Sequence, residues 1–159
     1  EAAQALIDQG ADIIMQHTDS TAAVQVAEKA GVWSFGQASD MQKFAPKSIL
    51  TSIIDDWAPY YVERSIAARD GTWSQQNTWH GLKEGMVAMA PYNPAMGSDL
   101  VKEVKQLQKD LASGKANSFT GPIYDQKGNL LVAEGSVADD GLLGGMKVYV
   151  KGVEGDVPQ

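Results

Sequence analysis

Two adjacent carboxylates and an indole, Asp55, Asp56 and Trp57, have the chemistry to hold a small molecule. They follow directly on the apolar run Ile49–Ile54, where a strand is expected to end, and Pro59 marks the first turn of a helix behind them. A carboxylate accepts N–H donors, and an indole stacks on a flat ring. The stretch therefore predicts one wall of a ligand site. The alternative at each position is helix capping by an aspartate, or core packing by the tryptophan.

Polar side chains also follow two other apolar runs, residues 11–16 and 32–36, which have the length and composition of buried strands. In an open α/β sheet, ligands bind where the carboxyl ends of parallel strands meet. The three polar clusters are therefore expected to be neighbours in space. The predicted ligand-binding residues are Asp55, Trp57, Asp56, His17, Asp19, Gln37 and Asp40.

Catalytic signatures are missing from the sequence. There is no G-x-S-x-G nucleophile elbow and no glycine-rich phosphate loop, and the chain has no cysteine and only two histidines. His17 with Asp19 and Asp40 could be assembled into a triad, but a ligand contact or a surface position is the simpler role for this histidine. The sequence favours binding without chemical transformation, with no catalytic residue, no cofactor and no metal.

Composition narrows the class of ligand. The 159 residues carry a net charge of −7 without a basic stripe, which argues against nucleic acid as a partner. No apolar run reaches the length of about 18 residues that a membrane span requires. A lining of carboxylates, amides and aromatic rings disfavours anions and suits a flat, nitrogen-rich molecule.

The elements that must position these residues alternate between helix and strand in the first half of the chain. Short joints between helices and strands predict right-handed crossovers and a parallel sheet. The expected elements are helix 1–9, strand 11–16, helix 21–30, strand 32–36, strand 49–54 and helix 57–69.

The pattern changes after residue 70. The clearest helix is 99–113, with a leucine and valine stripe and Ser98 as its N-cap. Trp33 and Trp79 are expected in the core or at an interface. The other predicted elements are short strands at 79–82 and 85–90, a β-hairpin pairing 121–126 with 129–134, and a strand at 146–150.

A family resemblance rests on the order of several segments. These are GADIIMQHTDS, GVWSFGQASDM, ILTSIIDDWAPYYVERSIAARDGTW, GLKEGMVAMAPYN and FTGPIYDQKGN. Together they resemble the basic membrane protein family, the substrate-binding components of ABC importers related to periplasmic purine-nucleoside-binding lipoproteins. The resemblance covers essentially the whole chain and corresponds to the carboxyl-terminal half or so of a family member.

The resemblance implies an α/β fold of the type I periplasmic-binding-protein class, with ligand held between two lobes and closure sensed by an inner-membrane ABC permease. It implies an α/β lobe with the strand-end cluster in residues 1–70. Residues 71–159 would hold the hinge-crossing segments, a helix at 98–113 that completes the lobe, and the carboxyl-terminal hairpin. The N-terminal half of the parent would be a further partner. An exported periplasmic or cell-surface lipoprotein is expected, with its signal segment outside this chain.

The chain departs from the nucleoside-binding pattern at two places. Family members typically carry a ribose-facing acid just after the glycine of the GQASD-like segment, where this chain has Gln37 and Ala38, with Asp40 further on. They commonly carry a lysine where this chain has Asp55. The departures favour a free purine base or a similar nitrogen heterocycle. The alternatives are a purine nucleoside, an α/β enzyme acting on nucleosides, and a receptor domain that signals to another partner.

Overall fold

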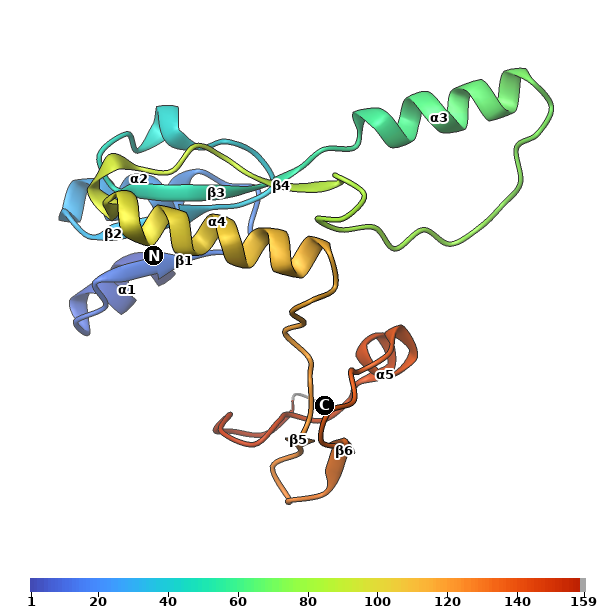
Figure 1. The fold of residues 1–159 in the computed structure, drawn as a ribbon. Helices are drawn as coiled ribbons and strands as arrows, with labels where there is room; N and C mark the ends of the chain where they lie inside the picture. The colour runs from blue at the N-terminus through green and yellow to red at the C-terminus, as the bar shows by residue number, and fades with distance from the viewer. Residues whose placement is uncertain (158–159) are drawn as a thin grey trace. The chain divides into compact units, whose positions relative to one another are not determined.

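Four strands in the spatial order β1-β2-β3-β4 form the sheet of the first of two units (Figure 1). The structure is a computed structural model that describes residues 1–157. The chain divides into two compact units, Glu1–Ser113 and Gly114–Gln159.

The first three strands are parallel. β1 (Ile13–Met15) pairs with β2 (Trp33–Gly36), and β2 pairs with β3 (Ile49–Asp55). The fourth strand, β4 (Val87–Met89), runs antiparallel to β3. The predicted α/β class with a parallel sheet is therefore confirmed, with one antiparallel strand added at the edge. Ser52 of β3 pairs with Gly36, the last residue of β2, and β3 continues for three more residues to Asp55.

The helices occur where the apolar periodicity places them. α2 ends at Gly31, whose φ of 72° is the left-handed conformation expected of a helix stop. The last helix of this unit, α4, begins at Ser98 with Gly97 as its N-cap, so the predicted N-cap at Ser98 is one residue too late. The helical elements of this unit are α1 (Ala2–Asp8), α2 (Ala22–Ala30), η1 (Gln42–Phe44), α3 (Ala58–Arg69), η2 (Pro94–Met96) and α4 (Ser98–Ala112).

One face of the sheet packs against α2. Val24 of this helix forms the main buried cluster with Met41, Ala45 and Ile49. Hydroxyl groups are buried beside it and are paired: Ser34 and Ser48 Oγ atoms lie 3.2 Å apart, Ser52 Oγ accepts from the Met41 amide at 3.2 Å, and Thr51 donates to the Ala90 carbonyl at 2.9 Å. These bonds tie together the sheet and the segments that follow β2 and β4.

The opposite face looks toward α4. Trp33 and Phe35 line a mostly apolar hollow of about 450 Å³ with Leu100 and Val104 of that helix. No residue of α4 is fully buried. Trp33 is 39 % exposed, so it borders this hollow rather than filling a closed core.

The segment after α3 differs from its prediction. Residues 79–82 form no strand, so the strand predicted there was wrong. Trp79 is 71 % exposed, so of the two predicted positions, core or interface, the core is excluded. The preceding residues 74–78 are all polar and offer nothing to bury, which leaves this segment outside the sheet.

The second unit contains the predicted hairpin, β5 (Ile123–Tyr124) antiparallel to β6 (Leu130–Val132). Residues 146–150 make only an isolated bridge between Val150 and Asp125, so the strand predicted there was wrong. A short helix, α5 (Asp140–Gly145), was not predicted, because three of its six residues are glycines that disfavour helix. Asp139 caps it by accepting from the Leu142 amide at 2.7 Å.

Candidate ligand site at the carboxyl ends of the strands

The loops that follow β1, β2 and β3 lie at one edge of the sheet, as the parallel pairing requires. The Asp55 amide donates to the Ala38 carbonyl at 3.0 Å, which joins the end of β3 to the loop after β2. Gln16 Nε2 lies 3.4 Å from Met41 Sδ, which joins the loop after β1 to the same region. The fold therefore brings the three predicted polar clusters to one edge, whereas their contact with a ligand stays a prediction.

The three residues after β3 have distinct surroundings. Asp55 is exposed, and within the described chain its carboxylate makes no hydrogen bond or ion pair, so it is open to a ligand. Asp56 Oδ1 accepts from the Ala58 amide at 3.2 Å in the turn that leads into α3, although the N-cap of that helix is Trp57 and not an aspartate. Trp57 is 47 % exposed, which excludes the core-packing alternative.

The residues from the other two loops are accessible. His17 and Asp19 are exposed, and Gln37 is half-buried. Asp40 is exposed, and its Oδ1 accepts from the Gln42 amide at 2.9 Å, which fixes the start of η1. Within the described residues, His17 has no hydrogen bond to either aspartate of the triad considered from the sequence.

The backbone of the loop after β2 carries strain. Ala38 has a φ of 63°, the one positive value at a residue other than glycine among the described residues. Such a conformation costs a residue with a Cβ on the order of 1–2 kcal/mol, and strained residues concentrate at functional sites. The strained residue also makes the contact between the two loops, because the Ala38 carbonyl accepts from the Asp55 amide. The sequence carries no signal for it.

Four rings gather beside the carboxylates, and we call Trp57, Tyr60, Tyr61 and His80 the aromatic cluster. Trp57 and Tyr61 are nearly parallel, with ring centroids 6.0 Å apart and planes inclined by 26°. Tyr60 meets Trp57 edge-on at 6.1 Å and His80 edge-on at 6.4 Å. The helical spacing of the two tyrosines from Trp57 could have revealed them, whereas His80 arrives through an irregular segment that sequence periodicity does not place.

The segment that carries His80 is tied to the same place. His80 Nδ1 lies 3.1 Å from Met86 Sδ, and the Met86 carbonyl accepts from the Asp56 amide at 2.8 Å. The Thr78 hydroxyl donates to the Tyr60 hydroxyl at 3.4 Å. The aromatic cluster is thus held from α3 on one side and from residues 78–86 on the other.

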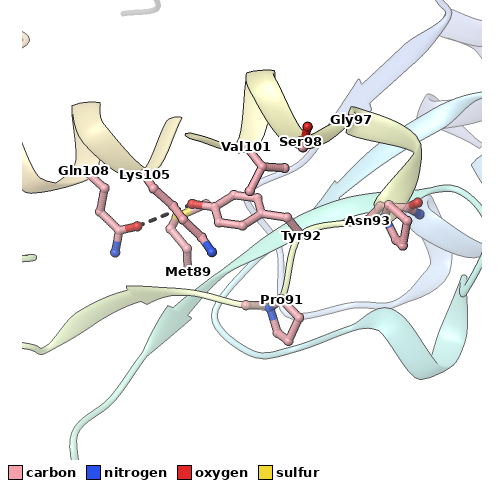
Figure 2. A pocket seen from close by; sticks show the side chains of 11 residues that line it. Met89, Pro91, Tyr92, Asn93, Gly97, Ser98, Val101, Lys105 and Gln108 are labelled. Carbon is pink, nitrogen blue, oxygen red and sulfur yellow. Dashed lines mark hydrogen bonds between the residues drawn. The ribbon is translucent and has the colours of Figure 1, made fainter. Parts of the chain in front are cut away.

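A larger hollow, of about 730 Å³, lies between the segment after β4 and α4 (Figure 2). Lys105 Nζ lies 5.9 Å from the Tyr92 ring centroid, and the Tyr92 hydroxyl donates to Gln108 Oε1 at 3.3 Å. Burial raises the pKa of the Tyr92 phenol. Because the Asn93 amide donates to the Leu50 carbonyl, this hollow lies near the beginning of β3, at the opposite end from the predicted residues.

Size alone does not make the Tyr92 hollow the better candidate. It is open, and it contains no carboxylate that could accept from a nitrogen heterocycle. The strand-end region combines an unpaired carboxylate with exposed rings. Within residues 1–157, no group of three or more His, Asp or Glu is placed to hold a metal ion, and no helix is long and apolar enough to cross a membrane.

Two curated proteins resemble the chain along nearly its whole length. A purine-binding protein of Brucella abortus is 53 % identical over 159 residues, which are all of this chain and 45 % of that protein. A putative ABC transporter glucose-binding protein of Haloferax volcanii is 30 % identical over 158 residues, which are 99 % of this chain and 38 % of that protein. The chain therefore spans less than half the length of these relatives.

Solved structures share the fold at low sequence identity. A transcriptional activator of the comK gene from Bacillus halodurans superposes with a TM-score of 0.65 at 15 % identity, over 72 % of this chain and 41 % of that one. An ABC transporter solute-binding protein from Conexibacter woesei superposes with a TM-score of 0.56 at 24 % identity, over 73 % of this chain and 40 % of that one. The sheet and its helices therefore have the fold of part of these solved proteins.

The family model described as "ABC transporter substrate-binding protein PnrA-like" matches residues 1–146, most of the chain. The match agrees with the resemblance carried by the strand-end segments and with the α/β fold. The chain belongs to this Bmp family of ABC transporter substrate-binding proteins.

Proposed function

We propose that this chain forms part of the solute-binding component of an ABC importer and binds a free purine base, or a similar nitrogen heterocycle, without transforming it. The observation that carries the proposal is the unpaired Asp55 carboxylate at the end of β3. It lies two residues before Trp57, whose ring stacks with that of Tyr61. A carboxylate accepts from ring and exocyclic N–H groups, and the rings offer a flat apolar surface.

The two named relatives and the loop after β2 support the choice of a free base over a sugar or a nucleoside. The relative named as purine-binding is 53 % identical to this chain, whereas the one named as glucose-binding is 30 % identical. The loop after β2 presents Gln37 and Ala38 where a ribose-binding acid is expected. One acceptor for the ribose hydroxyls is therefore missing at this place, which favours a free base over a nucleoside.

A purine nucleoside in the same site is the second candidate. It is favoured by Asp40, whose carboxylate is exposed two residues beyond Ala38 and uses one oxygen for the Gln42 amide. The other oxygen would be available to a ribose hydroxyl. An α/β enzyme that acts on nucleosides is the alternative from another class, and turnover of a bound nucleoside would favour it.

The proposal extends to the rest of the transport system. The partners are an inner-membrane ABC permease and a second lobe, supplied by the part of the family length that these residues do not span. Residues 1–70 contribute the strand-end cluster, and later residues contribute the hinge-crossing segments and the hairpin. We propose that the protein is a lipoprotein of the periplasm or the cell surface.

The direct test is Asp55→Ala, measured as the dissociation constant for adenine by calorimetry. Loss of a charge-assisted hydrogen bond should weaken binding by about 1.5–3 kcal/mol. The matched control is Asp12→Ala, since Asp12 is an exposed carboxylate just before β1, at the other end of the strands. Equal affinities for the Asp55→Ala variant and the parent protein would remove Asp55 from the site.

A further inference from the structure

We propose that the Tyr92 hollow is a second ligand site, which takes a small carboxylate with an apolar body. The hollow lies near the beginning of β3, at the opposite end from the strand-end residues. The inference therefore goes beyond the proposed function and does not depend on it. It gives a role to a cavity that the binding of a nitrogen heterocycle leaves unused.

The hollow has the size and the fixed wall of a ligand pocket. Its volume of about 730 Å³ falls within the range of about 300–1,000 Å³ that is usual for small-molecule pockets. Asn93 is buried, and its side chain donates to the Ile49 carbonyl at 2.8 Å. On the other side of Tyr92, the Ala90 amide donates to the Ser52 carbonyl at 2.9 Å. The segment that carries Tyr92 is thus held to the sheet at both ends.

The walls of the hollow offer a surface for an apolar body. Met89 and Pro91 lie on one side of the Tyr92 ring, and Val101 of α4 lies on the other side (Figure 2). The ring itself is half-buried and adds a flat apolar face. A small aromatic or aliphatic group can therefore bury most of its surface here.

The free polar groups of the hollow are donors. Lys105 Nζ lies 5.9 Å from the Tyr92 ring centroid, and among residues 1–157 it forms no ion pair or hydrogen bond. Gln108 Oε1 accepts from the Tyr92 hydroxyl, which leaves the Gln108 Nε2 group to donate. These two side chains are three residues apart on α4 and are therefore neighbours on its surface. One carboxylate can accept from both.

The local charge favours an anion in spite of the net charge of the chain. The lining of the hollow contains one charged side chain, Lys105, and no aspartate or glutamate. Exposed charges more than about 8 Å apart are largely screened at physiological ionic strength. A carboxylate in the hollow therefore interacts with the lysine more strongly than with the acids elsewhere on the chain. Charge complementarity thus selects a carboxylate over a neutral or cationic ligand of the same shape.

The experiment titrates the protein with benzoate and with benzamide, which has the same ring without the charge, and follows backbone amide resonances by NMR. Both probes should shift the resonances of residues 89–94 and of α4 saturably. Benzoate should bind about 2- to 5-fold more tightly, the effect of an exposed ion pair. Lys105→Gln should abolish this preference, and because Lys105 is exposed the variant should fold as the parent does. Lys109→Gln, which changes an exposed lysine of the same helix outside the hollow, is the matched control and should keep the preference.

The outcomes decide between a carboxylate site and a simple surface depression. A preference for benzoate that is lost in Lys105→Gln and kept in Lys109→Gln supports the site. Equal dissociation constants for the two probes in the parent, or no saturable shift around Tyr92, would overturn it. A preference that persists in Lys105→Gln would overturn it as well. Displacement of benzoate by adenine would show that the hollow is not a separate site.

Discussion

Asp55 and Asp56 are neighbours in the sequence but differ in whether their carboxylates are free to bind a ligand. Asp56 accepts from the Ala58 amide in the turn that leads into α3, whereas Asp55, one residue earlier, has a free carboxylate. Sequence reasoning places both at the strand end but cannot assign these roles, because adjacent side chains diverge and only the local turn determines which one meets the helix amides.

Another aspartate, Asp125, makes the hairpin of the second unit dependent on pH. It accepts from Asn129 Nδ2 at 2.7 Å and from the Lys127 and Asn129 amides at 2.8 Å each. The Asn129 side-chain bond, aided by the two amide bonds, lowers the pKa of Asp125 from its ordinary value of 3.8. Stabilisation by this group is therefore complete above that ordinary value and is lost as pH falls through the lowered pKa.

We predict that protection of the Lys127 and Asn129 amides against hydrogen exchange, corrected for intrinsic rates, falls as pH decreases below the ordinary aspartate value of 3.8 and through the lowered pKa of Asp125. Asp125→Asn should lower this protection at neutral pH and flatten its pH dependence. Asp156→Asn, which changes an exposed carboxylate of the same unit, should leave the profile of the parent. Constant protection down to the lowest pH would refute the role given to Asp125.

At the scale of elements, the close approach of β2 and β3 depends on Gly36. A Cβ built on this residue would lie 2.1 Å from Ser52 Oγ and 2.8 Å from Ser52 Cβ. Ser52 cannot move aside freely, because it is buried and its Oγ accepts from the Met41 amide. The absence of a side chain at Gly36 therefore allows β2 and β3 to approach closely just before the loop of Gln37 to Asp40.

Gly36→Ala should accordingly lower the free energy of unfolding by about 1–3 kcal/mol, the usual range for overpacking a buried site. Urea denaturation followed by circular dichroism measures this change. Gly81→Ala is the matched control, since a Cβ there meets no atom within 4 Å and its φ is not positive. A loss no larger than that of the control would show that the two strands can separate without cost.

Elements with strong periodicity were predictable, and irregular ones were not. The parallel strands β1 to β3, the helices α1 to α4 and the hairpin all follow from apolar spacing and turn residues. The left-handed Ala38 and the packing of His80 on Tyr60 were not foreseeable, because each depends on contacts between segments far apart in sequence. The residue types at the site could thus be inferred from the sequence, but its aromatic wall required the fold.

At the scale of the whole molecule, the chain spans less than half the length of the curated relatives it matches, so the candidate site is one edge of the larger site that we propose. The strand ends, the open carboxylate and the paired rings lie together at this edge. The net charge of the whole chain, −7, is consistent with a neutral or cationic heterocycle as ligand and disfavours an anionic solute.

The most direct test is a thermal-shift measurement on the protein with adenine, guanine, their nucleosides and glucose, all at one concentration that is a hundred times the dissociation constant for adenine. At that excess a bound ligand adds about 2.7 kcal/mol of stability, which raises the Tm of a chain of this size by several degrees. We predict such a rise with adenine or guanine, a smaller effect of their nucleosides at equal concentration, and none with glucose. No shift with any purine, or a shift with glucose alone, would contradict the account.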